Sequence, residues 1–406
     1  MALEKQVEEL IGLHNLAVAE GRKYEKRRFV YGQLERALRS RAYIGLAGLR
    51  GSGKTVLLRQ LASENQSSFY ISMDSIGGET KLFELARELS QNYGKKLLLI
   101  DEIHFCPNWQ AELKKAYDFL DVKIAFTSSS SVEIMQSKHD LSRRVLIIPI
   151  MPFSFREYIY FRKGVLEKAL SLDAIAADPK KHYGSLMQYE PDFLEFCTRG
   201  ALPACLGTPE PQVLRNIVEK IINKDLLAVG KLDNADLQNI SAILRFMSRA
   251  GVEVCSYSSV AKNTGTTKYK VQYYLSLLEK AFVVKIVPPY GTNITKEPKI
   301  LYALPFRQHF ADGAGSERLI GALREEFFIH HISGAGLQAN YLKSARGEKL
   351  ADYLVFEGSK KFIFEIGGSG KTGAQLKGAP KGARFVLNQP GNLAKGVPLI
   401  LFGFLW

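Results

Sequence analysis

The sequence predicts an α/β fold whose first part is a parallel sheet covered by helices. Short apolar runs alternate with helical stretches from residue 43 to residue 149, which is the pattern of such a sheet. Residues 48–55 read Gly-Leu-Arg-Gly-Ser-Gly-Lys-Thr and fill every position of the phosphate-loop pattern G-x-x-x-x-G-K-[S/T]. The chain of 406 residues also exceeds one typical domain, so two to four domains are expected.

The elements of the sheet can be assigned from hydrophobic periodicity. We expect strands at residues 43–47, 68–72, 96–100, 122–127 and 145–148. Helices are expected at 31–41, 82–93 and 109–120, with another directly after the phosphate-loop pattern. Ligands of such sheets bind at the carboxyl ends of the strands, so partners of the loop are sought there.

Strand, glycine-rich turn and helix together form a site for phosphate. Glycines let backbone N–H groups curl around a phosphate, and the following helix N-terminus adds partial positive charge. Lys54 would reach the β- and γ-phosphates of ATP, and the hydroxyl of Thr55 would ligate Mg²⁺. The predicted nucleotide-binding residues are Gly48, Arg50, Gly51, Ser52, Gly53, Lys54, Thr55 and Val56.

Two acidic residues follow the third predicted strand, whose residues 97–100 are all aliphatic. Acids at the end of a buried strand are costly unless they have a partner or a function. Asp101 can therefore hold Mg²⁺, and Glu102 can orient or deprotonate the attacking water. The alternative is an exposed acidic turn.

Hydroxyl and arginine side chains offer further contacts to the γ-phosphate. Ser128 follows the fourth strand and is the favoured sensor, although a serine-rich turn would look the same. Phosphoryl transfer also uses a positive charge, usually arginine. Arg143 and Arg144 precede the fifth strand and are candidates in cis or across a subunit contact; the alternative is a surface pair.

Composition points to a basic cytoplasmic protein. The net charge of +14 suits contact with nucleic acid, although it also fits simple solubility. The basic residues at 22–28 are interpreted as a solvated helix face, and the alternative is a contact with phosphate or a partner. No apolar run approaches a membrane span, and the four cysteines form no C-x-x-C pair, which fits a reducing compartment.

Several motifs together resemble one family. They are the phosphate loop, Leu-Ile-Asp-Glu-Ile-His-Phe-Cys-Pro-Asn-Trp at 99–109, Phe-Thr-Ser-Ser-Ser at 126–130, Leu-Ser-Arg-Arg at 141–144 and Met-Pro-Phe-Ser-Phe-Arg-Glu-Tyr at 151–158. Their order and spacing resemble the prokaryotic AAA-like ATPases whose C-terminal half is a nuclease-like domain of unknown function. The resemblance implies ATP binding and hydrolysis, without a known substrate.

The resemblance also implies a domain order. Residues 1–30 would be an N-terminal helical segment and residues 31–158 the ATPase domain. Residues 159–235 would be a helical lid, and residues 236–295 a winged helix-turn-helix. Residues 296–406 would be a restriction-endonuclease-like domain, which we expect to be degenerate.

The predicted winged helix has a third helix at 267–280. Val271, Tyr274, Leu275 and Leu278 share its core face, and Lys268, Tyr269, Gln272 and Tyr273 can face outward. Lysine, aromatic and amide groups suit contact with DNA. Packing between domains is the alternative use of this face.

Three acidic residues match the metal-binding positions of the nuclease-like fold: Glu326, Asp352 and Glu365. Active members have lysine two residues after the glutamate, where this chain has Gly367. Lys371 can reach back from the following loop, and otherwise the electrostatic stabiliser of the phosphate is missing. Residues 368–372 repeat Gly51 to Thr55, but Glu365 occupies the place of Gly48 and would repel phosphate, so no second ATP site is expected.

The sequence thus favours an ATPase that uses ATP and Mg²⁺ to drive or gate a C-terminal half binding DNA, a protein partner or a second copy. One alternative is a nucleotide-gated regulatory switch with slow hydrolysis. Another is an ATP-regulated, metal-dependent DNA nuclease.

Overall fold

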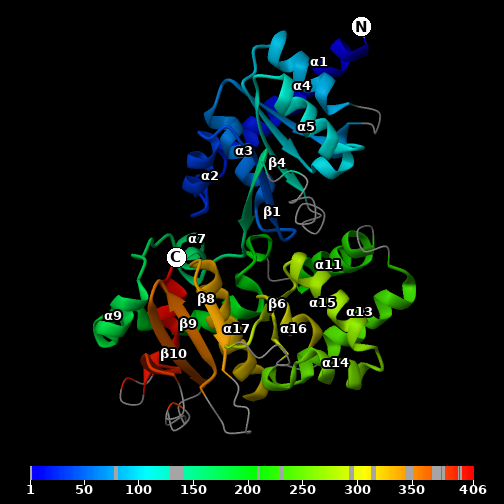
Figure 1. The fold of residues 1–406 in the computed structure, drawn as a ribbon. Coiled ribbons are helices and arrows are strands. Elements are labelled where there is room, and N and C mark those ends of the chain that lie inside the picture. The colour runs from blue at the N-terminus through cyan, green and yellow to red at the C-terminus, as the bar shows by residue number, and fades with distance from the viewer. Residues whose placement is uncertain are drawn as a thin grey trace. The chain divides into compact units, whose positions relative to one another are not determined.

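The computed structural model consists of two compact units, which are described separately: Met1–Met151 and Pro152–Trp406 (Figure 1). The described residues are 2–76, 81–128, 141, 143–207, 211–227, 232–291, 297–311, 317–342, 351–367, 376, 380–391, 393 and 396–406.

A five-stranded parallel sheet forms the centre of the N-terminal unit. Its strands are β1 (Tyr43–Gly48), β2 (Ser68–Ser72), β3 (Leu97–Asp101), β4 (Lys123–Ser128) and β5 (Val145–Ile150). They lie in the order β2-β3-β4-β1-β5, and every neighbouring pair is parallel. This confirms the predicted α/β fold class. Strands β1 and β3 are buried throughout, as expected where helices cover both faces of a parallel sheet.

Among the described residues of this unit, five α-helices flank the sheet: α1 (Ala2–Arg22), α2 (Tyr31–Leu38), α3 (Lys54–Glu64), α4 (Leu82–Gln91) and α5 (Trp109–Phe119). Apolar residues of α2 and α3 pack in one core, and those of α4 and α5 pack in a second core (Figure 1). Helix α1 contributes to both cores. It lies so close to α3 that a Cβ on Gly21 would be 2.1 Å from the carbonyl oxygen of Arg59, so the N-terminal helix is an integral part of this unit.

The C-terminal unit begins with a helical region. Its helices are α7 (Phe155–Lys163), α8 (Leu172–Ala177), α9 (Pro179–Leu186), α10 (Phe193–Glu195) and α11 (Pro211–Lys220). Apolar residues from α7 to α10 lie in the same core as those of the C-terminal sheet. This part of the chain therefore folds with the C-terminal unit.

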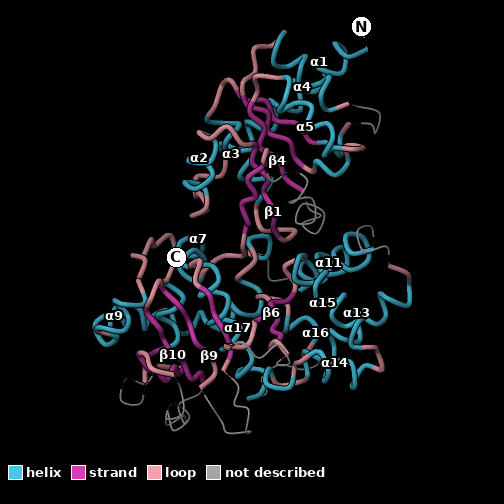
Figure 2. Tube along the Cα trace, in the orientation of Figure 1, coloured by secondary structure: helices cyan, strands magenta, loops and turns pink. Residues whose placement is uncertain are grey.

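Three helices and a hairpin follow: α13 (Asn234–Arg249), α14 (Tyr257–Thr264), α15 (Lys268–Lys280), β6 (Val284–Val287) and β7 (Lys299–Tyr302) (Figure 2). The four residues predicted for the core face of α15 are all buried. Tyr269 is 80% exposed and Tyr273 is 41% exposed, so the predicted outward face is also present.

A second sheet ends the chain. Its strands are β8 (Gln338–Tyr341), β9 (Tyr353–Glu357), β10 (Lys360–Gly367), β11 (Ala383–Asn388) and β12 (Val397–Pro398), preceded by α16 (Arg307–Phe310) and α17 (Glu317–Gly334). The order is β12-β11-β10-β9-β8, with β10 parallel to β11 and antiparallel to β9.

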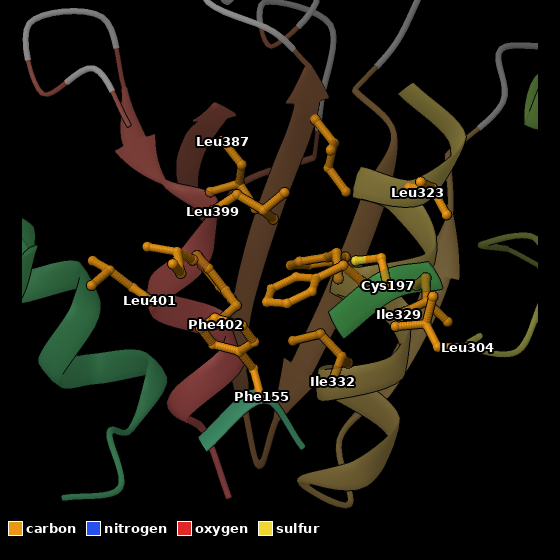
Figure 3. Close-up of a cluster of buried hydrophobic side chains, with 14 of the residues drawn as sticks. Phe155, Cys197, Leu304, Leu323, Ile329, Ile332, Leu387, Leu399, Leu401 and Phe402 are labelled. Atoms are coloured by element: carbon orange, nitrogen blue, oxygen red, sulfur yellow. The ribbon is translucent and has the colours of Figure 1, made fainter. Parts of the chain in front are cut away.

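Aromatic side chains from distant segments fill the core of this unit. The ring centroid of Phe155 on α7 lies 5.8 Å from that of Phe327 on α17 and 5.7 Å from that of Phe404. Figure 3 shows Phe155 and Phe402 beside aliphatic residues of α17 and the C-terminal segment. No helix within the described ranges has the length and apolar character that crossing a bilayer requires.

Candidate functional site

The phosphate-loop pattern forms the turn between β1 and α3, as predicted. Gly51 and Gly53 have φ angles of 77° and 92°, in the left-handed region that favours glycine. Gly48 is required for a different reason, because a Cβ there would be 2.3 Å from the carbonyl oxygen of Ile150. The loop therefore depends on glycine at three positions.

The loop curls around the ammonium group of Lys54. Lys54 is 6% exposed and donates to the carbonyl oxygens of Gly48 and Leu49 at 2.8 and 2.9 Å. The hydroxyl of Ser52 is buried and has no hydrogen-bond partner among the residues that the structure describes. A buried hydroxyl of this kind favours a ligand that completes its hydrogen bonding. Together with the N-terminus of α3, these groups fit the phosphates of a nucleotide.

The remaining predicted loop residues lie around this turn. Arg50 and Val56 are half-buried on either side of it, and Thr55 is half-buried in the first turn of α3. Thr55 thus lies next to Lys54, where its hydroxyl could serve as an oxygen ligand. Magnesium prefers oxygen ligands, which matches a hydroxyl and a carboxylate.

Arg28 also contributes to the loop, although a solvated helix face was the favoured interpretation of the basic run that contains it. It is only 7% exposed, so the interpretation of residues 22–28 as a solvated face is wrong at this position. Its guanidinium donates to the carbonyl oxygen of Ser52 and, at 2.8 Å, to that of Met151. Arg27, by contrast, pairs with Glu64 in a more exposed position. Both arginines occur in one charged run, which gives no signal to tell them apart.

Asp101 ends β3 and is 3% exposed. Its carboxylate accepts a hydrogen bond from the hydroxyl of Tyr70 at 2.8 Å and another from the hydroxyl of Thr127. These donors offset the cost of burying the carboxylate. A carboxylate has about four acceptor sites, so capacity for a metal ion remains.

Strand β4 lies between β1 and β3 and therefore connects the two halves of the site. Ser128, the last residue of β4, is in register with Ala47, one residue before Gly48. Thr127 binds Asp101 and also accepts the backbone N–H of Glu102 at 3.1 Å. The carboxyl end of β4 thus lies between the phosphate loop and the acidic pair.

Glu102 has a backbone conformation uncommon for a non-glycine residue, with a φ angle of 53°. Its carboxylate oxygen Oε2 lies 3.2 Å from Nδ1 of His104. The hydroxyl of Ser128 lies 3.0 Å from the same nitrogen. His104 was not among the predicted site residues, although its place two residues after Glu102 was visible in the sequence.

The arginine candidates lie at the other end of the sheet. Arg144 precedes the first residue of β5 and binds Asp118 through two hydrogen bonds of 3.0 and 2.9 Å. Strand β5 is in parallel register with β1, and six residues of strand separate Arg144 from the loop end by roughly 17 Å. The prediction that Arg144, or the adjacent Arg143, acts in cis is therefore wrong. A role across a subunit contact stays a prediction.

In the C-terminal unit, Glu326 does not join the expected acidic cluster. It is 1% exposed and forms an ion pair with Arg307 at 2.7 Å. It also accepts the backbone N–H of Tyr302. Burial raises the pKa of Glu326 to about 7 in spite of Arg307. This carboxyl is committed to internal packing, which corrects its assignment to a metal site.

The preceding residue, Glu325, faces the region of Asp352 instead. It accepts from Lys299 at 2.5 Å and from the hydroxyl of Tyr353 at 2.7 Å. Burial acts to lower the pKa of Lys299, but Glu325 and Asp352 outweigh this effect and raise it. The ammonium group of Lys299 is therefore the cation among these carboxylates.

Asp352 directly precedes β9, and Glu365 lies on the neighbouring strand β10. Phe364 is in register with Tyr353, which places the next pair, Glu365 and Asp352, opposite one another, and Asp352 accepts the N–H of Ile366 at 2.7 Å. Lys371 and the repeat at 368–372 lie outside the described residues. Within the described ranges, no group of three His, Cys, Asp or Glu residues could hold a metal ion.

Two protein-family models match different parts of the chain. Residues 40–159 match the family described as AAA domain, and residues 190–303 match a domain of unknown function. An uncharacterized protein of Methanocaldococcus jannaschii is 28% identical over 389 residues, covering 87% of this chain and 82% of the relative.

Two solved structures are similar to this chain. The Walker-type ATPase of Pyrococcus abyssi is 13% identical, with 70% of this chain and 95% of that chain covered and a TM-score of 0.43. The Aeropyrum pernix ORC1 protein in complex with DNA is also 13% identical, with 76% and 95% covered and a TM-score of 0.26. Because both scores are below 0.5, neither likeness carries an argument. The loop and the parallel sheet give the N-terminal unit the fold of a P-loop NTPase domain, and residues 40–159 are similar to the AAA domain family.

Proposed function

We propose that this protein binds ATP with Mg²⁺ in its N-terminal unit and hydrolyses it to drive or gate a C-terminal half that binds DNA or a protein partner. The observation that carries the proposal is the loop around Lys54, with the orphaned hydroxyl of Ser52 beside it. Asp101 ends β3 and Glu102 follows it, at the same edge of the sheet, where ligands of parallel sheets bind.

Each residue of this edge has a proposed role. Lys54 and the loop N–H groups would hold the phosphates, and Thr55 and Asp101 would hold Mg²⁺, which neutralises charge on the phosphates. Glu102 would orient the attacking water. Ser128 would contact the γ-phosphate, which its register beside Ala47 supports.

The helices α13 to α15 and the β6–β7 hairpin have the order of a winged helix-turn-helix, and we propose that fold for them. Tyr269, Gln272 and Tyr273 form the exposed face of α15. Lys268 pairs with Glu297 and Lys270 pairs with Asp236, so part of the positive charge is neutralised within the protein. The face therefore suits a protein partner or a second copy as well as DNA.

A nucleotide-gated switch with slow hydrolysis is a second candidate, and Arg28 favours it. This side chain connects Ser52 in the loop with Met151, the last residue of the N-terminal unit. A change in loop geometry on nucleotide binding would thus reach the residue before Pro152. We do not extend the proposal to DNA cleavage, because Lys299 pairs with Glu325 and lies close enough to Asp352 to feel its charge.

The test is ATP hydrolysis by the purified chain with Mg²⁺, with and without DNA, beside a Lys54→Ala variant. Turnover that DNA stimulates supports a driving role, whereas tight retention of ATP with slow turnover supports the switch. If the unmutated chain neither binds nor hydrolyses ATP, or if Lys54→Ala behaves identically, the proposal is wrong.

A further inference from the structure

We propose that His104 is a positioning residue for hydrolysis, which holds the carboxylate of Glu102 and connects it to Ser128. This inference rests on the proposed ATPase function and extends it to a residue outside the predicted site. One nitrogen, Nδ1 of His104, lies 3.2 Å from Oε2 of Glu102 and 3.0 Å from the hydroxyl of Ser128.

The chemistry of the three groups decides which of them donates. An ionised carboxylate only accepts hydrogen bonds, so Nδ1 must carry a hydrogen to bind Glu102. The hydroxyl of Ser128 can then accept from the same N–H. His104 therefore directs the carboxylate and connects it to the hydroxyl of Ser128.

Local structure fixes the imidazole in this place. His104 lies in a short 3₁₀ helix, Ile103–Phe105, that begins directly after the left-handed residue Glu102. Ile103 is fully buried, and the rings of His104 and Phe105 have centroids 4.4 Å apart. The side chains of His104 and Glu102 are 14% and 21% exposed. The pair is thus held by packing while water can still reach the carboxylate.

The arrangement joins the two parts of the site across β4. Ser128 lies beside the strand that leads into the phosphate loop, and Glu102 follows β3 on the other side. Glu102 has a positive φ angle, and such strained residues are concentrated at functional sites. Close polar contacts through His104 therefore connect Ser128, the proposed γ-phosphate contact, with Glu102, the proposed group that orients water.

The experiment compares the unmutated chain with His104→Ala and His104→Asn in steady-state ATP hydrolysis. Asparagine carries an amide nitrogen about as far from the backbone as Nδ1, so it can still donate to Glu102. We expect His104→Ala to lower kcat by about 100-fold with little change in KM, as for a misplaced catalytic group. His104→Asn is expected to recover most of that loss.

Binding of a non-hydrolysable ATP analogue should be equal in all three proteins, which shows that the loop is intact. A His104→Ala variant with unchanged or higher kcat overturns the inference, as does an asparagine variant no better than alanine. A rise in KM at constant kcat also overturns it, because it would show a role in binding. Absence of hydrolysis by the unmutated chain instead overturns the proposed function, and this inference with it.

Discussion

The guanidinium group of Arg28 connects the carbonyl oxygen of Ser52 in the phosphate loop with that of Met151, at the end of the N-terminal unit. Hydrogen bonds to a charged donor stabilise by about 1.5–3 kcal/mol each, so this side chain is expected to contribute on the order of 3 kcal/mol or more. Its planar fork reaches two acceptors at once, which the point charge of lysine cannot reproduce.

We therefore predict that Arg28→Ala lowers the melting temperature and weakens ATP binding by at least about tenfold, and that Arg28→Lys restores little of either. Arg27→Ala is the matched control, because its more exposed ion pair with Glu64 should be worth no more than about 1 kcal/mol. Titration with a fluorescent ATP analogue and thermal unfolding measure both effects. Equal results for the Arg27 and Arg28 variants would contradict the assigned role.

Gly48 provides a test of the loop's backbone. A Cβ at this position would lie 2.3 Å from the carbonyl oxygen of Ile150, and neither backbone can move without disturbing the β1–β5 pair. Gly48→Ala is expected to destabilise the unit by about 1–3 kcal/mol, as overpacking does, and to impair nucleotide binding.

Gly32 on α2 serves as the control for Gly48. A Cβ there has no atom within 4 Å, so Gly32→Ala should stabilise the helix by up to about 1 kcal/mol. If the close approach at Gly48 is as described, the melting temperature should fall for Gly48→Ala and rise for Gly32→Ala. Nucleotide titration of both variants should show impaired binding for Gly48→Ala. A stable Gly48→Ala protein with full ATP binding would refute this reading.

Much of the N-terminal unit was predictable because its signals are local. Each strand is a short apolar run, and the phosphate loop and the acidic pair each occupy consecutive positions. The predictions that were wrong depend on the direction in which a side chain points in three dimensions. Arg27 and Arg28 are neighbours in one charged run, yet one pairs near the surface and the other is buried against the loop.

The same limitation explains Glu325 and Glu326 on α17. Successive residues on a helix point about 100° apart, so an error of one position moves the carboxylate to another face. Glu325 faces Lys299 and Tyr353, whereas Glu326 binds Arg307. The partners Lys299 and Arg307 come from segments before α17, and no spacing rule in the sequence connects them to it.

Lys299 makes a prediction about metal binding possible. Because its ammonium group faces Glu325 and Asp352, Lys299→Met would leave two half-buried carboxylates without this cation, at a cost of about 1–3 kcal/mol. We expect Mn²⁺, without nucleotide, to raise the melting temperature of Lys299→Met and to leave that of the unmutated chain nearly unchanged.

In the double variant Lys299→Met, Asp352→Asn, Mn²⁺ should no longer raise the melting temperature, because one of the two carboxylates is missing. If Mn²⁺ instead stabilises the unmutated chain and Asp352→Asn abolishes this effect, the carboxylates bind metal with Lys299 present. That result would reopen the nuclease hypothesis for this region.

The buried pair of Glu326 and Arg307 predicts how stability depends on pH. Burial raises the pKa of Glu326 to about 7, whereas the ordinary value in an unfolded chain is about 4.3. The folded state therefore binds this proton more tightly than the unfolded state does. The resulting stabilisation is fully present below the unfolded value and is lost as pH rises through about 7, with a slope of at most about 1.4 kcal/mol per pH unit.

Glu326→Gln isolates this contribution, because glutamine keeps the shape of the protonated acid and does not titrate. The free energy of unfolding of the unmutated chain, minus that of Glu326→Gln, should decrease between about pH 5 and pH 7. Denaturant unfolding at several pH values measures this difference. A difference for Glu326→Gln that increases with pH would mean that Arg307 keeps the carboxylate ionised, because the folded state would then release this proton more readily than the unfolded chain.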